Sequence, residues 1–524
     1  MRLIELANDI GFEYPMLAIV NGKLRELNFE INDTADITFL DISNPDGYRT
    51  YSRTLKFIFI KACDELYPGQ KTTIEHALCG GLYCEIERPY NISEIISKMR
   101  DIVNQDLPIN KIVLSKDEAI QLFYERNMIG KAELIKYKEK GSVKIYKCED
   151  FIEHFYGHML PSTGFIKTFN IVPYNNGMIL LGPDKKNVEK VASFLPQHKL
   201  GEVYREFEDW SNVLGISNVV DLNRIIESGK YGNMIRTVEV LQEKKLGQIA
   251  DKIKEQRKKI ILIAAPSSSG KTSFAHRLSI HLKVNGINTV AISMDNYFVD
   301  RKDTPIDEYG KPDYESIKAI RVEQFNRDLK DLLEGKEIKV PIFDFKLGQQ
   351  FISNETMKLD KDEVIIIEGI HGLNPSLTKD IAEEDKFKIY LSVLTQINLD
   401  NHSRIPTTDL RLLRRMVRDN THRGCNAENT IMNWGSVRRG EELNIFPYQE
   451  QADVVFNSAG LHELALLKVY AEPLLEEIQP DSPAYLEAIR LLRLLQYFVK
   501  LEDISDIPNT SIVREFIGGS KIVH

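Results

Sequence analysis

The stretch KKIILIAAPSSSGKTSFAHRL, residues 258–278, decides the fold of the second half of this 524-residue chain. Residues 260–264 form an apolar run that is typical of a buried strand. Phe274 and Leu278 then recur at helical spacing. Between strand and helix, residues 265–272 follow the spacing GxxxxGK[ST], except for an alanine in place of the first glycine. In such a loop, backbone N–H groups and the helix N-terminus bind anionic phosphate.

This P-loop predicts ATP and Mg²⁺ as cofactors. Gly270 allows the backbone to approach the phosphates closely, and Lys271 places a positive charge on the β- and γ-phosphates. The hydroxyl of Thr272 can ligate Mg²⁺. The expected nucleotide-binding residues are Ser267, Ser268, Ser269, Gly270, Lys271, Thr272 and Ser273.

Two carboxylates follow predicted strands of the same half. Asp295 comes directly after TVAISM, and Glu368 directly after the apolar run 364–367. Ligands of parallel sheets bind at the carboxyl ends of the strands. Asp295 there could accept the proton of an attacking hydroxyl, and Glu368 could lie on the magnesium side beside Thr272. The alternatives are that Asp295 caps a turn and that Glu368 is an ordinary strand end.

The segment DLRLLRRMVRDNTHRG, residues 409–424, is rich in arginine. Arg411, Arg415 and Arg418 share one helical face, and Arg423 follows. Arginine suits phosphate oxygens, and cations that arrive with the substrate would stabilise transferred phosphoryl charge. We therefore predict a mobile catalytic lid, with a solvated basic helix face as the alternative.

The order of patterns along the chain predicts several parts. The first 47 residues are expected to be short strands, with a hairpin at Asn21-Gly22. Mixed helices and strands follow to about residue 220, and a charged helix leads into the strand–helix alternation that predicts an α/β fold with a parallel sheet flanked by helices. The predicted segments are 1–47, 48–220, 221–257 (a helical connector), 258–462 and 463–524 (helices and tail).

Composition excludes some classes of function. The chain is 43% hydrophobic and 28% charged, as globular proteins are, and its formal net charge of −9 argues against broad binding to nucleic acid or anionic membrane. The sequence contains no apolar run of about 18 residues, so no membrane span is expected. The N-terminus does not resemble a signal peptide. Five cysteines without metal-site spacing indicate reduced thiols and a cytoplasmic location.

An ordered set of motifs between residues 258 and 458 resembles the uridine kinase and phosphoribulokinase family. The motifs are APSSSGKTS, MDNYF, KPDYES, PIFDF, IIIEGIHGLNP, RLLRRMVRDNTHRG and ADVVFNS. The resemblance implies Asp295 as the general base and Thr272 and Glu368 on the Mg²⁺ side. The phosphate-binding catalytic residues that it implies are Lys271, Arg415, Arg418 and Arg423. The implied residues around the acceptor are Phe343 and Phe345 for the base, and Tyr297, Asp313 and Tyr314 for the sugar.

The chain departs from uridine kinases on the acceptor side. Phe343 stands where they usually have tyrosine, and Gly348 stands about where they have histidine. Gly310 replaces an aspartate that grips the ribose, and Cys425 replaces a further lid arginine. Since lost hydrogen-bonding groups change which substrate a site accepts, these positions weaken the expectation of uracil recognition.

The N-terminal half carries looser resemblances. Residues 1–47 resemble the small β-grasp TGS domain, through LAIVNGKLRELNFEINDTADITFLDI. Residues from about 50 to 215 resemble the second additional, editing-type α+β domain of threonyl- and alanyl-tRNA synthetases, through KACDELYPGQ, HALCGGLYCEIE, DEAIQLFYERN and YGHMLPSTGFIKTFNIVPY. The metal-ligand positions of that domain correspond to Arg53, Phe57, Phe155 and Met159. None of these is a zinc ligand, so we predict no zinc and no editing hydrolysis, and a scaffold used for contact, dimerisation or regulation.

Three functions remain open at this stage. The first is a nucleoside 5′-kinase using ATP and Mg²⁺, and the second is a kinase of another alcohol, such as a phosphosugar or a pantothenate-like molecule. The third is a nucleotide-switched RNA-binding or sensor protein, which the net charge and the base-plus-metal set disfavour. The expected partner is a nucleoside; no membrane is expected, nucleic acid is disfavoured, and homo-oligomer formation is left open.

Overall fold

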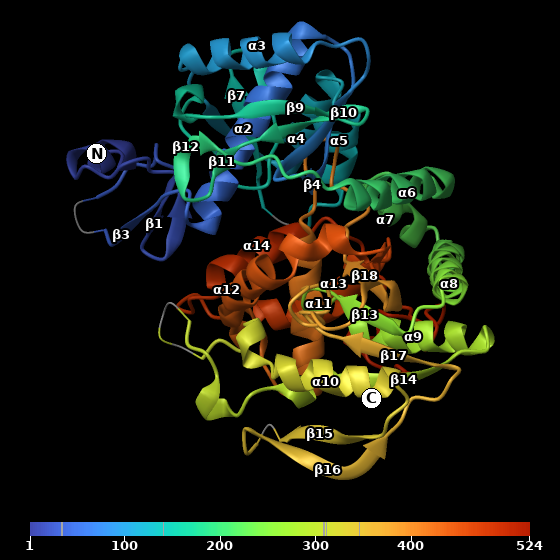
Figure 1. Cartoon of the computed structure of the whole chain (residues 1–524). Helices are drawn as coiled ribbons and strands as arrows, with labels where there is room; N and C mark the ends of the chain where they lie inside the picture. Colours follow the sequence, from blue (N-terminus) through green and yellow to red (C-terminus); the bar gives the residue numbers. More distant parts are fainter. Residues whose placement is uncertain (33–34, 140, 308–309, 311, 345, 524) are drawn as a thin grey trace.

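The computed structural model describes the chain except residues 33–34, 140, 308–309, 311, 345 and 524. The N-terminal part lies above the C-terminal part in Figure 1, and helices α6, α7 and α8 run down one side between them. These helices span His198–Leu214, Val219–Glu227 and Tyr231–Glu255.

The chain begins with a helix and a three-stranded antiparallel sheet. The sheet has the order β2-β1-β3, with β1 at Leu17–Val20, β2 at Lys23–Arg25 and β3 at Ile37–Leu40. Val20 pairs with Lys23, which confirms the hairpin predicted at Asn21-Gly22. The expectation of strands alone was wrong, because Leu3 and Ala7, four residues apart, are buried on one face of helix α1 (Leu3–Asp9).

The long helix α2 (Pro45–Leu66) forms the centre of the next part. Its N-terminus is capped by the Asn44 side chain, which accepts from the amide of Asp46. Around it lie the antiparallel sheets β4-β5-β10-β9 and β6-β7-β8 and the ribbon β11-β12. These strands span Thr72–Leu78, Gly81–Ile86, Asn110–Leu114, Val143–Cys148, Phe151–Glu153, Asn170–Tyr174, Gly177–Leu181, Pro183–Asp184 and Asn187–Val191 (β4 to β12). Helices α3, α4 and α5 span Ile92–Asn104, Lys116–Glu125 and Ile129–Lys136.

The C-terminal part is built on a five-stranded parallel sheet of order β14-β17-β13-β18-β19. Its strands, β13, β14, β17, β18 and β19, are Ile260–Ala264, Asn288–Ser293, Glu363–Glu368, Lys386–Ser392 and Val454–Asn457. Ile261 and Ile263 pack against α8 and α9 (Lys271–Val284), whereas Ile260 and Leu262 face α10 (Val322–Leu333). The predicted α/β fold with helices on both faces is confirmed.

The remaining elements extend this sheet domain. An antiparallel hairpin joins β15 (Ile338–Asp344) to β16 (Gln349–Met357) and lies at the lower edge in Figure 1. Helices α11 to α15 are Thr407–Arg423, Ala427–Asn444, Glu463–Glu476, Tyr485–Leu495 and Arg514–Ile517. Short 3₁₀ turns occupy Thr163–Phe165, Met294–Tyr297, Arg301–Asp303, Ile317–Ala319, Glu383–Asp385 and Phe446–Gln451.

The two parts are joined by apolar and ionic contacts. One apolar cluster contains Phe123 of α4, Leu413 of α11 and Leu491 of α14. Buried charges also cross the junction, because Lys131 contacts Glu153 at 2.6 Å and Asp400 at 3.3 Å. The segment boundaries predicted from the sequence therefore stay predictions, since the largest core extends across them.

Candidate active site

The P-loop connects β13 to α9 as the motif requires. Ser268 and Gly270 take left-handed backbone angles, with φ of 61° and 78°. A Cβ atom at Gly270 would also lie 2.3 Å from the side chain of Ile512, so this position is restricted to glycine twice over. The hydroxyl of Ser269 donates to the carbonyl of Pro266 at 2.7 Å and fixes the turn.

Lys271, Thr272 and Glu368 meet at the carboxyl edge of the sheet. The Thr272 hydroxyl lies 3.2 and 3.4 Å from the two carboxylate oxygens of Glu368, which ends the neighbouring strand β17. Burial raises the pKa of Glu368 against the opposing effect of Lys271, and burial lowers the pKa of Lys271. A hydroxyl and a carboxylate are oxygen ligands of the kind that Mg²⁺ takes, so these two residues fit a magnesium ion beside the P-loop.

Asp295 lies two residues beyond the end of β14, on the other side of β17. Ser293 of β14 pairs with Glu368, which brings Asp295 to the same edge as the P-loop. Its side chain is exposed, while partial burial by the surrounding protein raises its pKa and Lys271 opposes that shift. The arrangement places a carboxylate with an elevated pKa within the electrostatic influence of Lys271.

Helix α11 brings its arginines to the P-loop and to one shared carboxylate. Arg415 donates to the hydroxyl of Ser267 at 2.7 Å. Arg415, Arg418 and Arg423 contact Asp419 at 3.3, 2.8 and 3.7 Å, and Arg423 is exposed. Asp419 thus gathers the three predicted arginines at the end of the helix.

The expected mobile lid does not match the packing of α11. Leu410, Leu413, Met416 and Val417 are each at most 1% exposed and belong to the largest apolar cluster. Arg414 is completely buried and pairs with Glu463 at 2.6 Å. The helix is therefore a core element, because apolar residues alternate with its arginines, and only its last turn is exposed.

Two glutamates that the sequence did not single out bind the backbone of the P-loop. The Glu441 carboxylate on α12 accepts from the amide of Ser267 at 2.9 Å and pairs with Arg411. The Glu515 carboxylate on α15 accepts from the amide and the hydroxyl of Ser273 at 3.2 and 2.7 Å. Both glutamates lie far from the motif along the chain, so no spacing rule could have found them.

The acceptor side is formed by the hairpin β15–β16 and the turn after β14. The ring centroids of Phe298 and Phe343 are 5.8 Å apart at an angle of 63°. The carbonyl oxygen of the Asn296 side chain accepts from the amide of Phe343 at 3.3 Å, and its backbone carbonyl accepts from the Gln350 side chain at 2.8 Å. Phe345, also predicted for this pocket, lies outside the described residues.

The predicted sugar contacts divide into two groups. Tyr297 is 2% exposed, packs edge-on against Phe325 and directs its hydroxyl to Asp328 at 3.1 Å, so it lies in the core instead of at the surface where a sugar could reach it. The 3₁₀ turn that begins at Met294 rotates it inward. Asp313 is half-buried and caps the amide of Glu315 at 3.1 Å, whereas Tyr314 is 48% exposed.

The structure explains one departure from the uridine kinase pattern. Gly348 has a left-handed φ of 68°, and a Cβ there would lie 2.9 Å from the Cβ of Arg301. A histidine at this position would be strained and would clash with Arg301.

The prediction that the N-terminal half binds no zinc stays a prediction. No group of three or more histidine, cysteine, aspartate or glutamate side chains is arranged to hold a metal among the residues that the structure describes. Arg53 donates to the carbonyl of His158 at 2.6 Å.

Comparison with known proteins agrees with this geometry. Residues 260–465 match the Phosphoribulokinase / Uridine kinase family. A uridine kinase of Staphylococcus epidermidis is 30% identical over 208 residues, which are 40% of this chain and 91% of that enzyme. The chain belongs to the phosphoribulokinase/uridine kinase family. Its membership supports a P-loop phosphotransferase that acts on a nucleoside or a phosphosugar.

Among solved structures, a possible uridine kinase from Bacillus stearothermophilus is 20% identical, with a TM-score of 0.26. The match covers 38% of this chain and 89% of that one. The N-terminal region is similar to threonine–tRNA ligases: that of Carboxydothermus hydrogenoformans is 30% identical over 163 residues, 30% of this chain and 26% of the ligase. The chain spans about a quarter of the length of those ligases.

Within the described residues, no helix combines the length and apolar character that crossing a membrane requires.

Proposed function

We propose that this family member phosphorylates the 5′-hydroxyl of a nucleoside, using ATP and Mg²⁺. The observation that carries the proposal is the meeting of Asp295, Lys271 and Glu368 at the ends of three adjacent parallel strands. A nucleotide switch needs the lysine and the metal carboxylate, but it has no use for an acceptor base. The kinase reaction uses all three.

Each residue has a role in the proposed transfer. The γ-phosphoryl group passes from ATP to the acceptor oxygen, and the proton of the acceptor hydroxyl moves to Asp295. Lys271 and the arginines at positions 415 and 418 stabilise negative charge on the transferred group. Thr272 and Glu368 would hold a magnesium ion, which would supply positive charge beside the phosphate groups.

The aromatic acceptor side favours a nucleoside over a phosphosugar. Phe298 and Phe343 offer apolar ring faces on which a base can stack, and Asn296 and Gln350 lie beside them. A phosphosugar would favour cations at this place. Uracil as the base stays open, because the positions of Phe343 and Gly348 lack the usual polar partners.

The proposal also covers the two N-terminal segments and the location of the protein. We assign residues 1–47 to the TGS class and residues 48–220 to an editing-type domain without zinc or hydrolytic activity. We also expect a cytoplasmic protein with no membrane partner. The sheet β2-β1-β3 and the arginine at position 53 support these assignments.

The test is ADP release from ATP·Mg²⁺ with a panel of nucleosides and sugar alcohols. We expect turnover that depends on a nucleoside and falls about 10²–10⁴-fold in Asp295→Asn. Asp362→Asn is the matched control, because this exposed residue precedes β17 at the opposite end of the sheet, and it should keep full activity. Turnover only with sugar alcohols would favour the alternative acceptor, and nucleoside turnover that survives Asp295→Asn would refute the assigned base.

A further inference from the structure

A large cavity separates the N-terminal part from the kinase part. Its volume is about 680 Å³, which lies in the range of small-molecule sites. It is lined by α2, by residues 155–158, by the loop 399–409 and by α14. Its lining includes Arg53 and Phe155, two of the positions that the resemblance to the editing-type domain aligns with metal ligands.

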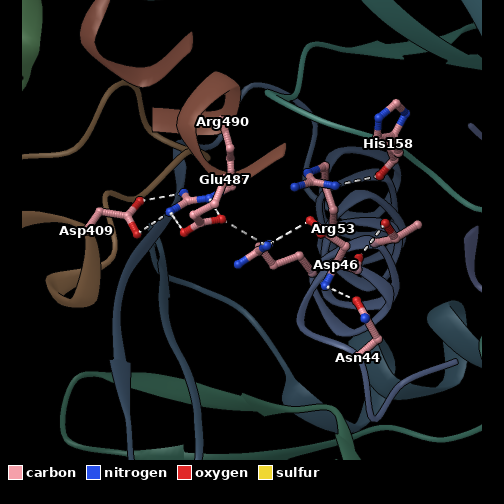
Figure 2. Close-up of polar contacts among 9 residues, drawn as sticks. Asn44, Asp46, Arg53, His158, Asp409, Glu487 and Arg490 are labelled. Carbon is pink, nitrogen blue, oxygen red and sulfur yellow. Dashed lines mark hydrogen bonds and ion pairs between the residues drawn. The ribbon is translucent and has the colours of Figure 1, made fainter. Parts of the chain in front are cut away.

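The cavity has a strongly positive lining in a negatively charged protein. Nine lysines and arginines line it against two aspartates, although the chain as a whole has a formal net charge of −9. The aspartates are already occupied: Arg490 binds Asp409 through two hydrogen bonds of 2.7 and 2.8 Å, and Arg49 binds Asp46 at 2.7 Å (Figure 2). The excess positive charge is therefore not balanced from within the lining.

Three cations of the lining have no carboxylate partner among the described residues. Arg53 donates only to the carbonyl of His158, as Figure 2 shows. The ammonium of Lys56 lies 3.4 Å from a backbone carbonyl and 5.0 Å from the centre of the Phe155 ring. Arg404 makes no ion pair within the described part of the chain, although the charge of Asp409 acts on it. These half-buried cations have lost part of their hydration without gaining a carboxylate in direct contact.

The pKa of Lys56 reflects the free-energy cost of these unpaired charges. Burial, followed by repulsion from Arg53 and Arg404, lowers its pKa to about 7, whereas Asp400 and the Cys84 thiol oppose the shift. Burial also lowers the pKa of Arg53 to about 10. A bound anion would remove this repulsion.

We propose that this cavity binds a small phosphorylated molecule, with Arg53, Lys56 and Arg404 on its phosphate oxygens. Two guanidinium groups and one ammonium match a group with several charged oxygens better than a single carboxylate. The size of the cavity and the net negative charge of the protein favour a compact ligand over a long polyanion such as RNA, which would extend along an acidic protein.

The test is isothermal titration of the full chain with pyrophosphate. The experiment uses a Lys271→Ala background, so that the P-loop contributes little binding. We expect one binding site, and we expect Arg53→Gln and Arg404→Gln each to weaken binding roughly tenfold or more. Arg327→Gln, an exposed residue of α10 outside the lining, is the control and should change nothing.

Binding at this site also predicts an uptake of protons. Near pH 8 the Lys56 amine is mostly neutral, and a bound anion raises its pKa, so binding takes up a proton. The binding enthalpy should therefore differ between two buffers of different ionisation enthalpy, and Lys56→Met should lower the number of protons taken up relative to the parent.

Three outcomes would overturn the proposal. The first is a Lys271→Ala protein that does not bind pyrophosphate. The second is binding that Arg53→Gln and Arg404→Gln leave unchanged in proteins that unfold at the same temperature as the parent. The third is binding of an RNA oligonucleotide in the absence of pyrophosphate binding, which would assign the cavity to nucleic acid.

Discussion

The P-loop and the cavity between the two parts are both rich in cations, but the buried arginines beside the P-loop are paired, whereas three cations of the cavity lining are not paired within the part of the chain that the structure describes. At the P-loop, Arg411 pairs with Glu441 and Arg414 pairs with Glu463. In the cavity, Arg53 and Lys56 contact backbone carbonyls and aromatic carbon but no carboxylate among the described residues. Paired cations hold a site in shape without a ligand, whereas unpaired cations leave binding energy for a ligand to gain.

The largest effect is expected where a paired cation is removed. Arg414→Met leaves the Glu463 carboxylate buried without its partner, which should destabilise the fold by about 3–5 kcal/mol in chemical denaturation. Lys185→Met is the control, because its pair with Glu442 is exposed and should contribute at most about 1 kcal/mol. Equal losses of stability in both variants would show that the buried ion pair contributes no more to folding than the exposed one.

A smaller effect is expected on catalysis at the P-loop. Lys271→Ala should lower kcat roughly 10²–10³-fold, because it removes a charge that stabilises the transferred group. Arg53→Gln, in the cavity, should leave kcat for the nucleoside within about twofold of the parent, since no transferred group lies there. Steady-state ADP release measures kcat of both variants. An equally large fall of kcat in Arg53→Gln would contradict the separation of the cavity from the catalytic site.

Removal of an unpaired cation should stabilise the fold, in contrast to removal of a paired one. Lys56→Met is expected to stabilise the ligand-free protein by about 1–2 kcal/mol, because the ammonium is desolvated without a carboxylate. The folded-state pKa of Lys56, about 7, is below its unfolded value, so the penalty is fully present below about pH 7 and disappears as pH rises toward the unfolded value. Thermal unfolding at pH 6.5 and pH 9.5 measures the gain, which should be larger at the lower pH.

The smallest effect is expected at Glu515. Its carboxylate occupies an amide of the first turn of α9, where phosphate groups bind in a P-loop, and it carries negative charge near Lys271. Glu515→Gln should tighten ATP binding by about two- to fivefold. The reason is that the variant removes a carboxylate that competes with the negatively charged phosphates for the helix N-terminus. Fluorescent-nucleotide titration measures it, and weaker binding in the variant would assign the glutamate a supporting role instead.

Much of the kinase half could be predicted from local patterns. The strand 260–264, the helix that begins at Lys271 and the carboxylates at 295 and 368 were all placed correctly, because parallel strands bring their carboxyl ends to one edge. The prediction for Tyr297 was less successful, because a single 3₁₀ turn decides whether a side chain points to a cleft or a core. Periodicity does not encode that direction.

The lid and the N-terminal half show a second limit. The arginine spacing on α11 suggested a mobile basic face, but the apolar residues between the arginines bury the helix among α13 and α14. The helix α1 was missed because two buried positions, Leu3 and Ala7, are too few to set a pattern.

The sequence by itself determined the phosphate loop, the carboxylates that follow two parallel strands and the family of the kinase half. Each of these depends on residues that are close together in the chain. Only the tertiary structure placed Glu441 and Glu515 on the P-loop and brought Arg53 beside Arg404 in one cavity. Those residues are hundreds of positions from their partners, and charge balance in space has no signature in local spacing.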